Sequence, residues 1–364
     1  MNDPIIIVGA GLAGLRAASM LVSHDVECCV LEARGRIGGR VLSSAVEDRP
    51  ELGKFDLGPT WFWPEHEPVI SKLVRELGLR TFLQHTEGAM LLERSQNEHI
   101  QRHILPEGAV QKSVRLIGGV GSLIDGVAAT LPRGTVKLNT RVTTIRMDEE
   151  GTLTLEADLP DGNKQSIRAR AVIFAIPPRI VARHIAFSPS LPADMTSMED
   201  KPTWMAGQAK AVAIYKRPFW REDGLSGQVT SWSGPLQEIH DASPDTGSGA
   251  LFGFFGIPAK IRQELGEERV LKLVVEQLTR LFGPAAEKPI SLLYKDWSCD
   301  FETAVENDSK PLTVFPDYGP PRITSVWEKK VIFSGTETSS EHGGHLEGAL
   351  RSAERAVFEV MELD

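Results

Sequence analysis

A glycine-rich turn between an apolar strand and a helix constrains the fold of this chain more than any other feature. The apolar run at residues 4–8 leads into Gly-Ala-Gly-Leu-Ala-Gly at residues 9–14, and a helical stretch continues to Leu21. In such a unit Gly9 permits the tight turn, Gly11 lets a pyrophosphate approach the backbone, and Gly14 lets the helix pack on the strand. The free N–H groups and positive dipole of the helix N-terminus favour an anion. The unit predicts a Rossmann-like α/β fold that binds a dinucleotide.

Glu32 supplies the context that this motif needs. It ends a second predicted strand at residues 26–31, where its carboxylate can accept hydrogen bonds from ribose hydroxyls. A carboxylate there repels a 2′-phosphate, which argues against NADP. The glycine pattern alone is weak, because a surface loop can carry it too. The strand before it, the helix after it and the acid at the expected distance favour the dinucleotide site.

The residues after Glu32 favour FAD over NAD. They are Ala33, Arg34 and the run Arg-Ile-Gly-Gly-Arg at residues 36–40. Adjacent glycines and arginines can wrap a second face of the pyrophosphate, and the arginine fork makes paired, charge-assisted bonds to phosphate. This extension resembles the FAD signature of the flavin-containing amine oxidases and their relatives.

Composition narrows the class of protein. The chain has 364 residues, of which 41% are hydrophobic and 24% charged, so we expect a globular protein with two domains. Its net charge of −9 disfavours nucleic acid or an anionic membrane as a partner. The three cysteines, Cys28, Cys29 and Cys299, form no disulfide or metal framework. With no signal peptide or membrane-spanning run visible, we expect a cytoplasmic protein.

The pattern of elements predicts a discontinuous nucleotide domain. We expect a helix at residues 68–79, an irregular segment at 84–111, hairpin strands at 135–145 and 152–159, and a strand at 169–175. Later elements are strands at 209–215, 250–255, 290–294 and 330–334, and helices at 267–282 and 345–362. The fold class is therefore α/β, with an FAD-binding domain of residues 1–60, 112–184 and 325–364. A mixed α+β substrate domain of residues 61–111 and 185–324 is inserted into it.

Several further segments strengthen the resemblance, which then covers most of the chain. Asp56-Leu57-Gly58 with Trp61, the turn Gly-Gly-Val-Gly-Ser at 118–122, Val142, and the closing segments 333–338 and 344–349 are similar to segments of the flavin monoamine oxidase family. The resemblance implies one set of FAD-binding residues: Gly9, Gly11, Leu12, Ala13, Gly14, Glu32, Ala33, Arg34, Gly39, Arg40, Gly58, Pro59, Thr60, Trp61, Val142, Gly335, Glu337, Gly344, His345, Leu346 and Ala349. The final helix then begins at the pyrimidine edge of the flavin, where its dipole stabilises negative charge. Close packing of Gly348 and Ala349 on a sheet is a compatible second reason for these small residues.

Lys210 is the sharpest catalytic candidate. In the predicted strand its side chain points the same way as Val212 and Ile214, and both faces of that strand are apolar. A buried ammonium is costly and tends to a lowered pKa. The family places a lysine in the corresponding motif to hold a water at flavin N5. The alternative is a lysine that reaches solvent along the sheet edge.

Trp297 and His345 complete the predicted catalytic set. Trp297 matches a family tryptophan before the active-site loop, and Trp61 and Trp63 can wall the substrate side. Each tryptophan can instead be an ordinary core residue. His345 stands where the family carries an aromatic ring that faces the amine. It can hydrogen-bond or act as a base, or it can be a solvated helix-start histidine.

The chain also departs from the family pattern. Lys310, Pro311 and Leu312 precede Phe315-Pro316 where covalent members carry a cysteine, so we expect dissociable FAD. The family often frames its amine with a cage of two facing aromatic rings, the first at the position of His345. The second cage position falls near Pro311, so no ring is expected there, and classical monoamines fit less well. The short stretch between the helix at 68–79 and the glycine turn implies an open site, or one completed by another subunit of a homo-oligomer.

These observations predict an FAD-dependent amine oxidase. A hydride equivalent passes from the amine α-carbon to flavin N5, water hydrolyses the imine to an aldehyde or ketone, and O₂ reoxidises the flavin to give peroxide. One alternative is a desaturase or dehydrogenase of the same fold acting on C–C or ring C–H bonds, which the missing cage favours. Another is a flavin-bound subunit without catalysis. No metal is expected.

Overall fold

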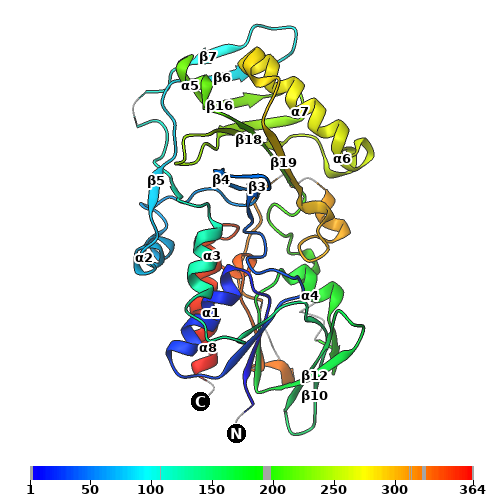
Figure 1. Cartoon of the computed structure of the whole chain (residues 1–364). Helices are drawn as coiled ribbons and strands as arrows, with labels where there is room; N and C mark the ends of the chain where they lie inside the picture. Colours follow the sequence, from blue (N-terminus) through cyan, green and yellow to red (C-terminus); the bar gives the residue numbers. More distant parts are fainter. Residues whose placement is uncertain are drawn as a thin grey trace.

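The protein consists of two large sheets at opposite ends of the molecule, joined by shorter elements (Figure 1). The computed structural model describes residues 3–106, 108–191, 198–310, 312, 314–321 and 325–362. Pro311, the expected second cage position, lies outside the described residues. Within the described part of the chain, no helix has both the length and the apolar character needed to cross a membrane.

The first sheet is parallel and has five strands. Its order is β20 (Val331–Phe333), β13 (Ala171–Phe174), β1 (Ile5–Val8), β2 (Cys28–Leu31) and β9 (Val136–Lys137). The strands come from three distant parts of the chain, which confirms a discontinuous Rossmann-like α/β fold. Both faces are covered, and this explains why β1 is apolar throughout rather than alternating.

The two faces of this sheet pack on different layers. Ile5 and Ile7 join the core with α1 (Leu12–Ser23), α3 (Gly121–Ala128) and α8 (Leu346–Met361). Ile6 and Val8 face a second sheet of order β12 (Lys164–Ala169), β11 (Leu153–Asp158), β10 (Arg141–Met147) and β14 (Ala186–Ser188). The strand period of two sends successive side chains of β1 into opposite cores.

The seven-stranded sheet forms the other end. Its order is β19 (Ser291–Asp296), β15 (Ala209–Tyr215), β18 (Gly249–Phe255), β17 (Leu236–Asp241), β16 (Leu225–Ser231), β6 (Ala89–Glu93) and β7 (Gln101–His103). Ala209, Ala211 and Ala213 of β15 pack in the core that contains α7 (Glu267–Phe282). Val212 and Ile214 pack on the opposite face, in the cluster around Phe55 and Phe252. The position of α7 across the sheet is visible in Figure 1.

The remaining elements connect and flank these layers. They are β3 (Ser43–Val46), β4 (Arg49–Asp56), α2 (Pro68–Glu76), β5 (Thr81–Leu83), β8 (Val114–Leu116), α4 (Pro178–His184), α5 (Phe219–Glu222) and α6 (Ala259–Leu265). Helix α2 packs against α8 through the core that also contains α1. The division of the chain into an FAD-binding and a substrate domain stays a prediction.

Two sequence-based expectations about elements were wrong. The predicted strand at 135–145 is two strands: β9 joins the parallel sheet, β10 joins the antiparallel one, and the chain changes direction at Asn139, whose φ is +53°. The segment at 84–111, expected to be irregular, contributes β6 and β7 to the seven-stranded sheet. Pairing with β16, far away in the chain, supplies the hydrogen bonds that the local sequence did not indicate.

Candidate active site

One cavity runs from the carboxyl ends of the parallel strands to the seven-stranded sheet. Gly9, Glu32, Ala175 and Gly335 line it, and each lies just beyond the carboxyl end of β1, β2, β13 or β20. Lys210 of β15 and Phe252 of β18 line it too. In open parallel sheets, ligands bind at this edge, so the topology itself places a site here.

The glycine turn at the start of α1 shapes one end of the cavity. Gly9 has a φ of +103°, and a Cβ on it would lie 2.5 Å from a side-chain carbon of Ile176. A Cβ on Gly14 would lie 1.9 Å from the carbonyl oxygen of Gly9, so the helix packs directly on the turn. At Gly11, by contrast, nothing lies within 4 Å of a built Cβ. The backbone is therefore open to a ligand at Gly11 and closed at the other two glycines.

The Glu32 carboxylate is held by two backbone amides beside this turn. It accepts hydrogen bonds from Ala10 N–H at 2.7 Å and from Arg34 N–H at 2.9 Å. Gly38 N–H donates to Ala10 O at 2.8 Å, which brings the glycine-arginine run against the turn. The carboxylate is 4% exposed and lines the cavity. Its charge is thus fixed at the end of β2, where the sequence placed it.

The arginines of this region are bound to protein groups. Arg34 pairs with Asp300 and donates to Thr303 Oγ1 at 2.8 Å. Arg40 makes a two-pronged ion pair with Glu337, at 2.5 and 2.9 Å. Burial opposes the charge of Arg40, but the Glu337 carboxylate raises its pKa above the ordinary arginine value. Arg34 and Arg40 line the cavity, and their contact with phosphate stays a prediction.

Lys210 is buried at the other end of the cavity. Its ammonium donates to Gly58 O at 2.9 Å and to Thr60 Oγ1 at 2.5 Å, and it lies 3.8 Å from the ring centroid of Phe252. The residue is 2% exposed, so the expected burial is confirmed and escape to solvent is not observed. No carboxylate lies within ion-pair distance of it among the described residues. Burial therefore lowers the pKa of Lys210 to about 7, although the charge of Asp56 opposes this and that of Arg115 adds to it.

Trp297 supports the loop that holds Lys210. Its indole N–H donates to Leu57 O at 3.0 Å, one residue before Gly58, and its side chain lines the cavity. Trp61 and Trp63 also line the cavity and meet edge to face, with ring centroids 6.4 Å apart. These rings form an apolar wall next to the lysine.

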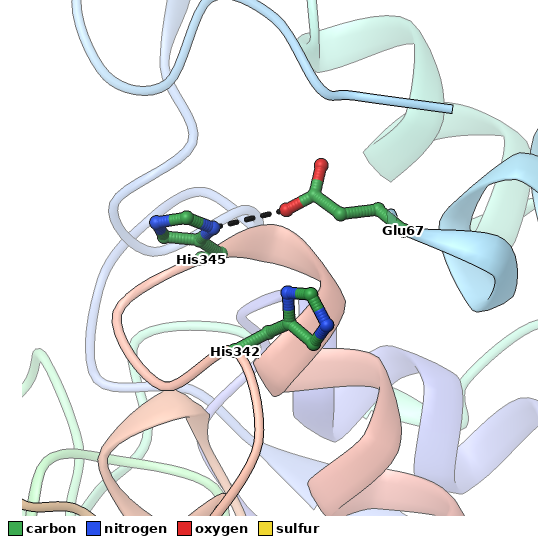
Figure 2. Close-up of side chains that lie close together, drawn as sticks. All are labelled: Glu67, His342 and His345. Carbon is green, nitrogen blue, oxygen red and sulfur yellow. Dashed lines mark hydrogen bonds and ion pairs between the residues drawn. The ribbon is translucent and has the colours of Figure 1, made fainter. Parts of the chain in front are cut away.

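The His345 side chain is 39% exposed, but its ring also has protein partners. Its Nδ1 lies 3.0 Å from Glu67 Oε1, and its ring packs 5.6 Å from that of Trp63 (Figure 2). Glu67 is 2% exposed, and its other oxygen accepts a hydrogen bond from Trp63 N–H at 2.8 Å. Glu347 accepts hydrogen bonds from Val69 and Ile70 N–H, so the start of α2 is fixed to the start of α8. This tie brings Glu67 to His345 across the sequence.

The comparisons with known proteins identify the family. The profile described as "Flavin containing amine oxidoreductase" matches residues 88–361, and one described as "NAD(P)-binding Rossmann-like domain" matches residues 7–77. The first match covers well over half of the chain. The chain belongs to the flavin-containing amine oxidoreductase family. The family acts on small-molecule amines with O₂ and uses FAD.

Curated relatives of this amine oxidoreductase agree over nearly its whole length. A probable flavin-containing monoamine oxidase A of Dictyostelium discoideum is 25% identical over 462 residues, which covers 98% of this chain and 97% of the relative. The putrescine oxidase of Kocuria rosea is 26% identical over 471 residues, with 98% and 95% covered. Alignments this long, against a chain of 364 residues, show that the relatives contain large segments that this chain lacks.

Solved structures show the same fold. A putrescine oxidase structure superposes with a TM-score of 0.82 at 22% identity, covering 100% of this chain and 99% of that one. The cyclohexylamine oxidase of Brevibacterium oxydans gives a TM-score of 0.82 at 20% identity, covering 100% of both chains. The family match, rather than the likeness of fold, makes this amine oxidoreductase an FAD-dependent enzyme of amine oxidation. The desaturase and the non-catalytic subunit are not favoured.

The cavity collects most of the residues that the sequence singled out. Those that line it are Gly9, Gly11, Leu12, Ala13, Glu32, Arg34, Gly39, Arg40, Gly58, Pro59, Thr60, Trp61, Lys210, Trp297, Gly335, Gly344, His345, Leu346 and Ala349. Four others do not. Gly14 lies beneath the turn, Glu337 lies behind Arg40, and Ala33 and Val142 line a small adjoining cavity that shares Glu32 and Arg34.

Sequence reasoning missed several residues of the amine oxidoreductase cavity. They include Glu67, Ala175, Ile176, Trp204, Phe252 and Phe254. The phenylalanines carried a usable signal, because alternate positions of a strand share one face and β18 pairs with the lysine strand. Glu67 carried none, since an acid before a helix that begins with proline suggests only a helix start.

The residues present fit FAD. The turn at Gly11 is open, the first N–H groups of α1 have no intrahelical acceptor, and a buried acid ends β2. The same cavity continues past Lys210 to the start of α8, where Leu346 lines it. A dinucleotide that spans these groups therefore has hydrogen-bond partners at one end and an apolar, lysine-bearing wall at the other.

Proposed function

We propose that this enzyme oxidises a small amine held between the Lys210 wall and the Glu67–His345 pair, with dissociable FAD and with O₂ as acceptor. The observation that carries the proposal is one cavity lined by the glycine turn, the buried lysine and the histidine at the start of α8. When bound, FAD supplies the acceptor for the hydride equivalent leaving the amine α-carbon. The protein supplies position, exclusion of water and electrostatics.

Lys210 acts in the oxygen half of the reaction. Gly58 O and Thr60 Oγ1 take two of its three N–H groups, and the third is left to hold a water in the cavity. A positive charge at this position favours electron transfer to O₂, because negative charge develops there. Trp297 acts as a positioning residue, since it holds the loop of Gly58.

His345 binds and orients the amine. Its Nδ1 is engaged by Glu67, so Nε2 is the ring atom left to a substrate. Trp63 packs on the imidazole and limits its rotation. His345 thus stands at one of the two positions where the family resemblance places a cage ring, and this favours amines that can hydrogen-bond to its imidazole.

The flavin is held without a covalent bond. The structure describes all three cysteines, and none of them lines the cavity. Their free thiols also support a reducing, cytoplasmic location. We retain the two-domain division of the chain, the absence of nucleic-acid and membrane partners, and a homo-oligomer as further proposals.

Two measurements test this function. Anaerobic mixing with a panel of amines is expected to bleach the flavin absorbance, and no bleaching with any amine would contradict amine oxidation.

Lys210→Met is expected to slow reoxidation by O₂ by about tenfold or more while changing reduction little, since one positioned charge is worth roughly 1.4 kcal/mol or more in a buried site. The exposed Lys216→Met serves as the control. An unaltered oxidative half-reaction removes Lys210 from the mechanism.

A further inference from the structure

A cluster of three metal-binding side chains lies in the wall of the cavity, where the oxidation chemistry requires none. Glu67, His342 and His345 each offer one ligand atom, and these atoms all lie within 4.8 Å of one another. Figure 2 shows the carboxylate and the two imidazoles gathered in one place. Glu67 comes from the start of α2, and the two histidines come from the turn before α8.

In the part of the chain that the structure describes, Glu67 lacks the arginine partner that most of the other buried carboxylates have. Glu337, Glu347 and Asp241 each pair with an arginine. Glu67 has no arginine or lysine partner among the described residues, and it faces only His345 and a backbone amide. A buried carboxylate is costly unless a cation neutralises it. Among the described residues, a histidine is therefore the one group at ion-pair distance that can neutralise Glu67, and a bound cation can take that role.

The donor set matches zinc. Two imidazoles and one carboxylate, with a fourth position open, is the ligand set of many Zn²⁺ sites. Ligands of one tetrahedral zinc ion lie about 3.4 Å apart. The ligand atoms of Glu67 and His345 are 3.0 Å apart and must separate by about 0.4 Å, and no pair of ligand atoms must approach by more than about 1.4 Å. His342 is only half-buried, which leaves its ring room to make that movement.

The surroundings also provide outer support for such a site. Trp63 N–H binds the second oxygen of Glu67, and outer hydrogen bonds of this kind orient metal-binding carboxylates. The tie between Glu347 and the start of α2 holds Glu67 at a fixed distance from α8. Two of the three donors are therefore fixed before a metal arrives.

We propose that Glu67, His342 and His345 bind a Zn²⁺ ion, and that this ion hinders amine binding in the cavity. Glu67 and His345 line the cavity, so an ion between them lies in its wall, on the Nδ1 side of the imidazole. An imidazole that binds a metal through Nδ1 keeps its proton on Nε2, so Nε2 can no longer accept a hydrogen bond from the amine that we assign to it. The inhibitory part rests on the proposed function, whereas binding of the ion does not. Zn²⁺ is thus expected to be a reversible inhibitor that a chelator removes.

Calorimetric titration of Zn²⁺ into the FAD-loaded full chain, without a histidine tag, tests the binding. We expect one ion per chain. His342→Asn is expected to weaken binding by about tenfold or more, and it suits the backbone because His342 has a φ of +52°, which asparagine tolerates. Glu67→Gln is a second variant with the same expected loss. His66→Ala, an exposed histidine next to Glu67, is the matched control and is expected to bind as the unchanged chain does.

Absence of saturable binding, or binding that neither His342→Asn nor Glu67→Gln weakens, would overturn the site.

A second experiment measures inhibition. Zn²⁺ is expected to slow flavin reduction by an amine, with recovery after chelation and no slowing in His342→Asn. Binding without slowing overturns the inhibitory part alone. If no amine reduces the flavin, the proposed function fails while the titration still decides the metal site.

Discussion

The two ends of the cavity are built in different ways. At the dinucleotide end, Gly9, Gly11, Gly14 and Glu32 come from one continuous stretch, and each group serves the strand, turn or helix in which it lies. At the amine end, Lys210, Trp297, Glu67 and His345 come from four separate segments. The first end depends on backbone geometry, and the second on charges that are buried without strong partners. Substitutions at the two ends should therefore fail in different ways.

Gly14→Ala should have the largest effect. The new Cβ would lie 1.9 Å from the Gly9 carbonyl oxygen, and a backbone atom cannot give way as a flexible side chain does. We expect a loss of roughly 3 kcal/mol or more of stability and a chain with little bound flavin. Yield and flavin content per chain measure this. Gly126→Ala in α3 meets only leucine side chains, and it should be tolerated.

Lys210→Met should stabilise the fold in a pH-dependent way. The folded-state pKa of Lys210, about 7, lies below its ordinary value of 10.5. Between these values the unfolded chain binds more protons, so the stability of the unsubstituted protein rises with pH in that window. The variant should be more stable by a few kcal/mol below pH 7, and this advantage should vanish toward pH 10.5. Urea unfolding across this range decides it, and a pH-independent difference would contradict the burial penalty.

Glu32→Ala should weaken FAD retention by about ten- to a hundredfold, because charged hydrogen bonds contribute about 1.5–3 kcal/mol each. Equilibrium dialysis of the apoprotein with FAD measures the change. Glu47→Ala, at an exposed position in the turn between β3 and β4, is the control. Unchanged occupancy in Glu32→Ala would show that the acid serves only the turn at Ala10.

His345→Ala should have a smaller effect, confined to the amine end. We expect the KM for amines to rise about tenfold, as for loss of one hydrogen bond of roughly 1.4 kcal/mol, with FAD content unchanged. Steady-state peroxide production measures it, and His66→Ala should leave the KM unaltered. If FAD content falls with KM unaffected, His345 belongs to the cofactor rather than to the substrate.

Cys299→Ser should have no effect on the flavin. The thiol is exposed and lies outside the cavity, so heat denaturation should release all of the FAD from both the unsubstituted chain and the variant. Flavin that stays with the precipitated protein would show a covalent bond and contradict the dissociable cofactor.

The sequence alone determined the dinucleotide end. Strand, turn, helix and acid are local features of one stretch of chain. Gly14 must be small because its helix packs on the carbonyl of Gly9, the residue directly after Val8. Local sequence patterns of this kind can be interpreted without coordinates. They also predicted the strand Ala209–Tyr215 and the helix Glu267–Phe282. They were wrong at residues 84–111 and 135–145, where distant strands provide the pairing.

Only the tertiary structure decided the amine end. Nothing local distinguishes Glu67 from an ordinary acid at a helix start, yet the tie between α2 and α8 carries it to His345. The burial of Lys210 depends likewise on which face of β15 meets the loop of Gly58. Electrostatic interactions depend on the distance between groups in space and not on their separation along the chain. The chemistry of the amine end therefore follows from how the layers pack.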